Sequence, residues 1–340
     1  AMPEAEQGMN VARIGVLLAG LPNTVPGITI NRFCSSGVQA VADAAARIRL
    51  GEADVMIAAG TETMSLLNQI MGNKIAINPA VFEKDENYAI AFGMGLTAEK
   101  VAEKWKVSRE DQDAFAVASH QKACAAIQAG HFKAEISPYP IKAHVPDLKT
   151  GEVKIREFLA DTDEGPRPDS SMERLAKLKP VFAARGSVTA GNSSQMSDGA
   201  GAVLVVSEKI LKQFNLKPLA RFAGYSVAGV PPEIMGIGPI EAIPRVLKQA
   251  GITQNDVDWF ELNEAFAAQS LAVMRHLDLD PAKVNPLGGA IALGHPLGAT
   301  GAIRTATLVH GLQRTKQRYG MVTMCIGTGM GAAGLFEAIF

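Results

Sequence analysis

Short apolar runs alternate along this chain with helical patterns of small residues, which predicts an α/β protein. Val25–Asn31 has the pattern of a strand, and Ser36–Leu50 has an apolar helical face that stops at Gly51. Val55–Ala59 is apolar throughout, as in a strand that is covered on both faces. A strand, a helix and a buried strand in this order predict a parallel βαβ unit.

The second part of the chain shows a related rhythm, so we expect two similar α/β halves. The strands expected there are Trp259–Leu262, Met321–Cys325 and Leu335–Phe340. The helical patterns are Glu264–Leu277 and Ala302–Leu312, and the glycine-rich turns are Gly288–Gly301 and Gly327–Gly334.

The middle of the chain, Ser65–Ser187, holds most of the long polar and proline-containing stretches. Ser108–Asp111 forms a capping box that opens a helix, and this helix is expected to stop at Gly130. Ile141–Arg167 mixes charges and prolines and is expected to be irregular surface. We therefore interpret the middle as an excursion inserted into the first half.

Composition narrows the class of protein. The 340 residues include 33 lysines and arginines and 34 acidic residues, so the near-neutral chain offers no footprint for nucleic acid. A local patch for one phosphorylated ligand is still compatible with this balance. No apolar stretch approaches the ~20 residues that a membrane span needs, and Ala1–Asn10 lacks the basic start of a signal peptide. Three cysteines are too few for a disulfide framework and fit a reducing compartment, which predicts a cytoplasmic protein.

Cys34 is the cysteine whose position favours reactivity. It lies between a predicted strand and a predicted helix, where the helix dipole and free backbone N–H groups favour a thiolate. Small neighbours are expected to keep the sulfur reachable. A buried cysteine that packs at a turn is the alternative explanation.

The other two cysteines differ in their surroundings. Cys325 ends a predicted strand before a glycine loop that begins at Gly327, and such loops expose N–H groups as oxyanion donors. An ordinary glycine turn explains this loop equally well. Cys124 shares a helical face with Val117 and Ile127, so we expect it to be a core thiol.

Two polar residues complete the set of candidates. His295 is enclosed by glycine and proline before a helix, which suits either a general base or a simple loop residue. Asn263 follows a predicted strand, where it is either an N-cap or a donor to a bound carbonyl or water. The carboxyl ends of strands are where ligands bind in open α/β sheets, so we expect Cys34, Asn263, His295 and Cys325 to meet. No cysteine–histidine spacing resembles a metal site.

These segments together closely resemble the thiolase family. The matching motifs occur in the family's order and spread over nearly the whole chain. They are Asn31-Arg32-Phe33-Cys34-Ser35-Ser36-Gly37, Gly191-Asn192-Ser193-Ser194, Asn263-Glu264-Ala265-Phe266, Gly294-His295-Pro296 and Cys325-Ile326-Gly327. The resemblance implies a five-layered α/β/α/β/α fold with two similar halves. It divides the chain into residues 1–66 of the first half, an inserted loop domain at 67–195, a return to the first half at 196–216, and a second half at 217–340.

The resemblance also implies a role for each catalytic candidate in the thiolytic cleavage of 3-ketoacyl-CoA. Cys34 is the nucleophile that becomes acylated, and His295 is its base. His295 and a water held by Asn263 form one oxyanion hole, while the backbone N–H groups of Cys34 and Gly327 form the second. Cys325 is the acid that protonates the departing enolate.

Coenzyme A is the expected co-substrate, with no tightly bound cofactor. Arg167 resembles the arginine at the nucleotide end of CoA and is otherwise a solvated charge. Ser194 resembles a serine that contacts pantetheine. Met235 and Phe266 resemble residues of the acyl or pantetheine channel, and without the family both are ordinary core residues.

Within the family, the motifs around Cys34 and Cys325 resemble the degradative type with broad chain-length range, which serves fatty acid β-oxidation. Acetoacetyl-specific members more often have a His-Met pair in the loop domain, where this chain has Gly93-Met94. Loss of that imidazole is expected to make room for longer acyl chains. The family also places a further strand and helix before the position of Ala1, so either the printed chain omits residues or it is a truncated form.

Several alternatives are open at this point. The chain is an acetoacetyl-CoA thiolase that works in the condensing direction, a ketoacyl synthase relative, or a non-catalytic CoA- or lipid-binding homologue. Cys325 argues against the synthases, which lack a second cysteine. The resemblance implies a homodimer or homotetramer joined through the sheet of the first half, and in some relatives a partnership with a multifunctional β-oxidation subunit.

Overall fold

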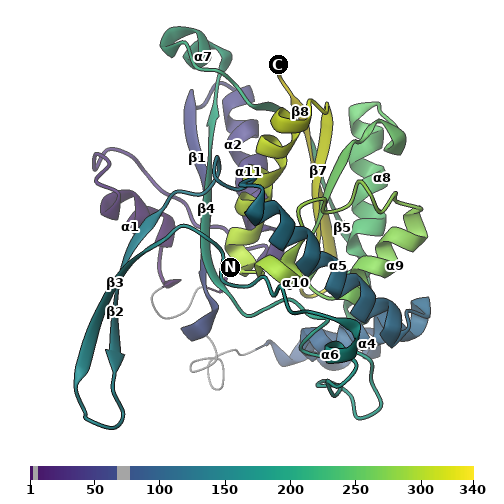
Figure 1. Cartoon of the computed structure of the whole chain (residues 1–340). Helices are drawn as coiled ribbons and strands as arrows, with labels where there is room; N and C mark the ends of the chain where they lie inside the picture. The colour runs from purple at the N-terminus through teal and green to yellow at the C-terminus, as the bar shows by residue number, and fades with distance from the viewer. Residues whose placement is uncertain (3–6, 67–76) are drawn as a thin grey trace.

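The computed structural model describes residues 1–2, 7–66 and 77–340. Its centre is a pair of helices, α2 (Ser36–Arg49) and α11 (Leu297–Thr315), which lie side by side between two sheets (Figure 1). One sheet has four strands in the order β5-β8-β7-β6, and the other has two, β1 and β4. Helix α8 (Gly238–Ala250) covers the outer face of the larger sheet.

The larger sheet lies wholly within the second half. Its strands are β5 (Ala220–Gly229), β6 (Trp259–Leu262), β7 (Tyr319–Ile326) and β8 (Met330–Ala338). Strands β6 and β7 are parallel, whereas β7–β8 and β5–β8 are antiparallel. All of β6 and nearly all of β7 is buried, as their apolar runs predict. The carboxyl ends of β6 and β7 therefore lie at one edge.

The smaller sheet pairs β1 (Val55–Thr63) with β4 (Asp198–Val206) in antiparallel register. Helices α2 and α11 pack on one of its faces. On the other face, Val55, Ile57 and Leu204 are 47%, 56% and 59% exposed. The prediction that Val55–Ala59 is covered on both faces is therefore wrong for this chain, although the strand itself is present.

The predicted parallel βαβ unit is also wrong. Val25–Asn31 forms no strand, and β1 pairs with β4 rather than with this segment. A strand needs a hydrogen-bonding neighbour, and the described residues place none beside Val25–Asn31. Only the helix of the predicted unit, α2, forms as expected, and it ends just before Gly51 at φ +75°.

Three α-helices lie in the described part of the region between β1 and β4. These are α4 (Met94–Trp105), α5 (Arg109–Gln128) and the short α6 (Met172–Leu175). The side chain of Ser108 caps α5 by accepting a hydrogen bond from Asp111 N at 3.0 Å, as predicted. The buried face of α5 includes Ala116, Ala123 and Ala126. Cys124 follows Ala123 in the helix, so its side chain points away from this face and is only half-buried. Cys124 is therefore not the core thiol that its spacing predicts.

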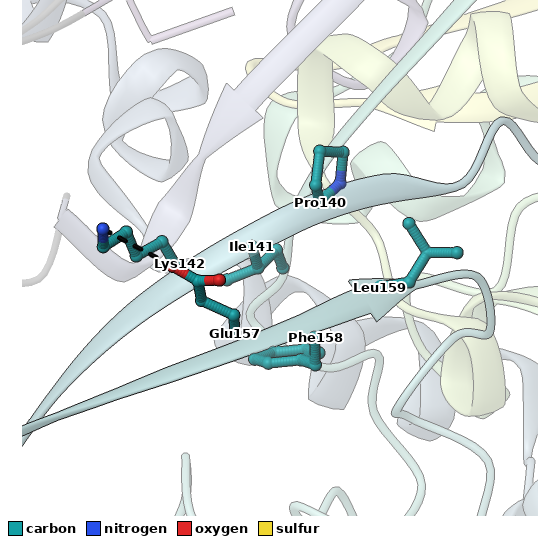
Figure 2. A pocket seen from close by; sticks show the side chains of 6 residues that line it. All are labelled: Pro140, Ile141, Lys142, Glu157, Phe158 and Leu159. Atoms are coloured by element: carbon teal, nitrogen blue, oxygen red, sulfur yellow. Dashed lines mark ion pairs between the residues drawn. The ribbon is translucent and has the colours of Figure 1, made fainter.

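Residues Ile141–Arg167 were expected to be irregular, but most of this segment is a long hairpin. Strands β2 (Tyr139–Pro146) and β3 (Val153–Ala160) pair antiparallel and project from the body (Figure 1). A shallow groove on the hairpin is lined by its own residues, beside the ion pair of Lys142 and Glu157 at 3.4 Å (Figure 2). Apolar and polar residues do alternate in 141–145 and 153–156, which is a strand pattern, but Pro140, Pro146 and the surrounding charges favour an irregular segment instead.

The remaining elements connect these layers. They are α1 (Val11–Leu18), α7 (Glu208–Phe214), α9 (Ala267–Leu277), α10 (Ala290–Leu293) and the 3₁₀ turns η2 (Phe33–Ser35), η3 (Pro79–Glu83), η4 (Asp85–Ala91), η5 (Pro232–Ile237) and η6 (Gln254–Asp256). Within the described ranges, no helix is both long and apolar enough to span a bilayer.

Candidate active site

Cys34 lies in the 3₁₀ turn η2 at the entrance to α2, and only 7% of it is exposed. Its thiol accepts backbone N–H groups from Gly327 and from Cys34 itself. The left-handed φ of +42° at the preceding Phe33 turns the chain sharply at this point. The sulfur therefore lies between the start of α2 and the turn that follows β7.

Burial raises the pKa of the Cys34 thiol to about 11, although the N–H groups of Gly327 and Cys34 act in the opposite direction. The expected thiolate and the expected reachable sulfur are thus both wrong for the free protein. The prediction considered the helix dipole and the free N–H groups, whereas the loss of hydration on burial has the larger effect on the pKa of this thiol. The thiol is protonated at neutral pH and must lose its proton during the reaction.

Cys325 is the second thiol of the site and is fully buried near the end of β7. Its burial, followed by the proximity of Cys34, raises its pKa well above that of a free thiol. Two residues further on, Gly327 opens the tight turn that leads into β8, where Gly329 has φ +94°. Cys325 is therefore a protonated thiol near the Cys34 sulfur.

Asn263 directly extends the end of β6, since its N–H donates to the carbonyl of Thr323 on β7 at 2.9 Å. It is not an N-cap, because α9 starts four residues later, at Ala267. Its Nδ2 lies 3.3 Å from Nε2 of His295. Its Oδ1 is buried and has no hydrogen-bond partner among the described residues. One atom of this amide is therefore paired and the other is free for a further group.

His295 is held between α10 and α11 in a single tautomer. Its Nδ1 lies 2.7 Å from Oγ1 of Thr300, and this hydroxyl donates its only hydrogen to the carbonyl of Pro296 at 3.0 Å. Nδ1 must therefore carry the imidazole hydrogen, which leaves the Nε2 lone pair toward Asn263. Burial, and then the charge of Arg304, lower the pKa of His295 to about 3. The ring is a neutral acceptor.

Thr300 was absent from the sequence-based set of candidates. Its signal is the spacing of five residues from His295 within the same glycine-rich motif. That spacing puts the hydroxyl on the first turn of α11, facing back to the ring.

Backbone-to-backbone packing brings these segments together. A Cβ on Gly37 in α2 would lie 2.3 Å from the backbone nitrogen of Ala302 in α11. A Cβ on Gly301 would lie 2.1 Å from the nitrogen of Val38. The amino ends of α2 and α11, which follow Cys34 and His295, can therefore touch only because both helices have glycine there.

The predicted meeting of strand ends can now be described. The structure places Cys34, Gly327 and Cys325 together, and it places Asn263 against His295. Cys325 also packs in one apolar cluster with Phe266, which follows Asn263 by three residues. Two protonated thiols and a neutral imidazole in a buried setting suit acyl transfer and the cleavage of a carbon–carbon bond beside a carbonyl.

Comparison with known protein families gives the same picture. The description "Thiolase, N-terminal domain" matches residues 1–209, and "Thiolase, C-terminal domain" matches residues 216–338. The chain belongs to the thiolase family.

Named relatives agree with this assignment. The 3-ketoacyl-CoA thiolase of Bacillus subtilis (strain 168) is 52% identical over 99% of this chain and 85% of its own length. The peroxisomal 3-ketoacyl-CoA thiolase A of Rattus norvegicus is 51% identical, over 98% of this chain and 76% of its own length.

Solved structures share the fold. The acetyl-CoA acetyltransferase of Bacillus anthracis has a TM-score of 0.87 at 43% identity, covering 99% of this chain and 85% of its own. A human mitochondrial 3-ketoacyl-CoA thiolase in complex with CoA has a TM-score of 0.86 at 40% identity, covering 100% and 85%. The dimeric peroxisomal thiolase of Saccharomyces cerevisiae has a TM-score of 0.85 at 42% identity, covering 97% and 82%. The thiolase-like α/β fold expected from the motifs is confirmed.

The four residues that the thiolase resemblance assigns to CoA and the acyl chain fall into two groups. Met235 and Phe266 are buried in the cluster that contains Cys325, and the ring of Phe266 meets the edge of Phe182 at 6.0 Å. Phe182 is 40% exposed, so this apolar cluster reaches toward the surface. Ser194 is half-buried, and its N–H donates to the carbonyl of Ala265 at 2.9 Å.

Arg167 lies further out. Its guanidinium is exposed and has no ion pair with any residue in the described ranges, while its backbone N–H donates to Nδ1 of His120 at 3.1 Å. The segment is anchored and the charged group is free in solvent.

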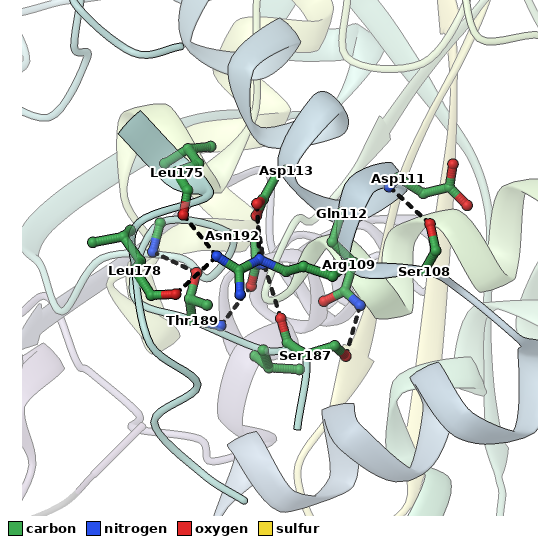
Figure 3. Close-up of polar contacts among 12 residues, drawn as sticks. Ser108, Arg109, Asp111, Gln112, Asp113, Leu175, Leu178, Ser187, Thr189 and Asn192 are labelled. Atoms are coloured by element: carbon green, nitrogen blue, oxygen red, sulfur yellow. Dashed lines mark hydrogen bonds and ion pairs between the residues drawn. The ribbon is translucent and has the colours of Figure 1, made fainter. Parts of the chain in front are cut away.

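A polar network fixes the thiolase loop that carries Ser194 (Figure 3). Arg109 Nε pairs with the Asp113 carboxylate at 2.8 Å, and that carboxylate accepts from Asn192 Nδ2 at 2.9 Å. Asn192 Oδ1 in turn accepts the N–H of Thr189 at 2.8 Å. The loop is thus tied to α5 two residues before Ser194.

Gly93 and Met94 lie beside the catalytic turn. A Cβ on Gly327 would lie 3.7 Å from the Met94 sulfur, so this thioether is next to the N–H that points at Cys34. A Cβ on Gly93 would have no neighbour within 4 Å. A methyl group therefore fits at position 93 without a clash with its described surroundings.

Proposed function

We propose that this protein cleaves 3-ketoacyl-CoA by thiolysis, giving acetyl-CoA and an acyl-CoA shortened by two carbons. The observation that carries the proposal is the Cys34 thiol, which accepts the backbone N–H of Gly327 beside a second buried thiol, Cys325. The relatives named 3-ketoacyl-CoA thiolase support the substrate class.

The first step acylates Cys34. As its sulfur attacks the 3-keto carbon, the thiol proton passes to Nε2 of His295. The low pKa of this imidazole makes a free ion pair unfavourable, so proton transfer accompanies bond formation. We assign the oxygen of the adduct to the N–H groups of Cys34 and Gly327, which point at the Cys34 sulfur in the free protein.

The second step breaks the bond between carbons 2 and 3. Its electron pair becomes the enolate of acetyl-CoA, and Cys325 gives its proton to carbon 2. We assign the enolate oxygen to His295 together with a water held by Asn263, whose buried Oδ1 has no described partner. Cys325 is left as a thiolate and His295 as an imidazolium.

The third step restores the protein. Coenzyme A gives its thiol proton to Cys325, and its sulfur attacks the acyl group on Cys34. The Cys34 sulfur leaves and takes back the proton from His295, so all atoms and charges balance. We assign Arg167 to the nucleotide end of CoA, Ser194 to pantetheine, and Met235 and Phe266 to the channel for pantetheine or the acyl chain.

The alternative is the reverse reaction, the condensation of two acetyl-CoA molecules, which uses the same groups. The B. anthracis structure named acetyl-CoA acetyltransferase favours this alternative. Comparing turnover of acetoacetyl-CoA with that of 3-ketooctanoyl-CoA separates the two, since a strong preference for four carbons contradicts the broad-range proposal.

The direct test of the mechanism is covalent. After incubation with 3-ketooctanoyl-CoA, the peptide that contains Cys34 is expected to gain the mass of a hexanoyl group. Cys34→Ala should abolish this adduct, whereas Cys325→Ala should block cleavage more than CoA binding. Normal turnover of Cys34→Ala would disprove the mechanism, and a folded wild-type protein that is never acylated would indicate a CoA-binding homologue.

We further propose a cytoplasmic homo-oligomer joined through the sheet of the first half. The exposed apolar face of β1 and β4 supports association, and the yeast structure is described as dimeric. The low cysteine count supports a reducing compartment, although the rat relative is named peroxisomal.

A further inference from the structure

Glu264 is a buried carboxylate with no role in the mechanism above. It directly follows Asn263, and only 2% of it is exposed. Its oxygens accept hydrogen bonds from Ser119 Oγ at 2.6 Å, Asn285 Nδ2 at 2.8 Å and the backbone N–H of Ile291 at 3.2 Å. No ion pair with any described residue compensates it. A buried charge is expensive unless it is well hydrogen-bonded, so this arrangement demands all of its donors.

The donors to Glu264 come from three separate segments. Ser119 lies on α5 and Ile291 lies in the first turn of α10. Asn285 also holds both backbone groups of Leu262, accepting from its N–H at 2.9 Å and donating to its carbonyl at 2.8 Å. The carboxylate therefore ties the end of β6 to the start of α10.

The contact with α10 requires a glycine. A Cβ on Gly289 would lie 2.1 Å from the carboxyl carbon of Glu264, and the N–H of Gly289 donates to Ser119 Oγ at 3.0 Å. Helix α10 ends at Leu293, and after Gly294 the next residue is His295. Only one residue separates α10 from His295, so the position of α10 determines the position of the imidazole.

We propose that Glu264 is a positioning residue that sets the distance between the Asn263 amide and the His295 imidazole. Asn263 precedes it in the chain, and His295 follows the short helix that it holds. The 3.3 Å separation of these two groups therefore depends on one carboxylate. The proposal rests on the roles given above to Asn263 and His295 as the pair that stabilises the enolate.

The test compares two reactions of the full chain. Thiolysis of 3-ketooctanoyl-CoA needs His295 and the Asn263 amide together to hold the enolate oxygen. Exchange of labelled CoA into acetyl-CoA uses His295 only to move the proton of Cys34 and does not use Asn263. Glu264→Gln keeps the side-chain shape but replaces one acceptor with an amide that faces N–H donors. We expect kcat for thiolysis to fall on the order of 10- to 100-fold, with KM little changed and exchange within roughly threefold of wild type.

Glu99→Gln is the matched control. The half-buried Glu99 carboxylate also accepts backbone N–H groups, from Ser187 at 2.9 Å and from Val188 at 2.9 Å, but it holds neither Asn263 nor α10. Its ratio of thiolysis to exchange is expected to equal that of wild type. If Glu264→Gln lowers both reactions equally, or neither, Glu264 is not a positioning residue.

A second variant covers the case in which Glu264→Gln does not fold. Ser119→Ala removes one donor to the carboxylate and the acceptor of Gly289 N–H, so it should lower the same ratio by roughly 3- to 10-fold. An unchanged ratio in this variant would contradict the proposal. Failure of the proposed function is distinguishable, because wild type itself would then lack thiolysis.

Discussion

The nucleophile and the base of this site are both neutral in the free protein. Burial raises the pKa of Cys34 to about 11 and lowers that of His295 to about 3. At the scale of single residues, neither Cys34 nor His295 therefore carries a charge before substrate binds. The sequence pointed to Cys34 and His295 correctly as candidates, but it misjudged the thiol, because a local pattern shows a helix start and not how deeply that start is buried.

The buried imidazole predicts a particular pH dependence of stability. In the unfolded chain His295 binds a proton below about pH 6.5. In the folded chain it binds this proton only near pH 3. The free energy of unfolding should therefore fall by about 1.4 kcal/mol per pH unit below pH 6.5 from this group. Denaturant titrations at pH 7 and pH 5 measure this effect. Between these pH values the free energy of unfolding of His295→Asn should fall by about 2 kcal/mol less than that of wild type.

The comparison contains its own control. Between pH 7 and pH 8 the wild-type and His295→Asn curves should run parallel, since neither state then takes up a proton at this position. A difference between the proteins that stays constant from pH 8 to pH 5 would show that the ring is not kept neutral by burial.

Residue 93 is predicted to control acyl chain length. Gly93→His would place an imidazole in open space next to Met94, whose sulfur lies beside Gly327. We expect kcat/KM for 3-ketooctanoyl-CoA to fall roughly tenfold relative to acetoacetyl-CoA, because one lost methylene-sized space is worth about 1–3 kcal/mol. Gly93→Ala, which adds a methyl group without a neighbour, should keep the wild-type ratio; equal ratios for both variants would contradict the prediction.

At the scale of elements, the crossing of α2 and α11 decides whether Cys34 and His295 meet. Gly37→Ala would drive a methyl group into the backbone of Ala302 and should lower the free energy of unfolding by about 1–3 kcal/mol. It should also slow acylation of Cys34, because the two helix ends must separate. Chemical unfolding and mass analysis of the Cys34 peptide measure the two effects.

Gly229→Ala serves for comparison, since a Cβ there meets nothing within 4 Å. This variant should unfold within about 0.5 kcal/mol of wild type. If Gly37→Ala behaves in the same way, the close contact of α2 with α11 does not constrain the site.

Elements differ in how well their sequences predict them. Helix α2 and strands β6 and β7 were predicted nearly at their observed bounds, because burial imposes a clear pattern on them. Val25–Asn31 has strand-like residues but no partner, and pairing is a long-range property. The strands β2 and β3 do show short alternating runs, but prolines and charges around these runs favoured an irregular segment, and the pairing of the two strands is not visible in either run alone. Glu264 and Thr300 were missed because their importance comes from contacts with other segments.

At the scale of the whole molecule, we propose that copies of the chain associate through the exposed apolar face of the smaller sheet. If the chain associates through this face, Ile57→Lys with Leu204→Lys should convert an oligomer into monomers, since the paired residues 57 and 204 would then repel any apolar partner. Light scattering with size-exclusion chromatography gives the mass of each form. Lys142→Ala on the hairpin is the control, and an unchanged mass of the double variant would place the interface elsewhere.

The helix that completes the first half is encoded late in the chain. Helix α11 packs on β1 and β4, and Gly298 N at its start donates to the Glu62 carboxylate of β1 at 2.7 Å. During translation, β1 leaves the ribosome more than 200 residues before α11 does, as the positions of Thr63 and Leu297 show. At about 5–20 residues per second, β1 waits ten seconds or more for this helix. The nascent chain should therefore depend on chaperones until α11 has been made, even though the second half holds a four-stranded sheet of its own.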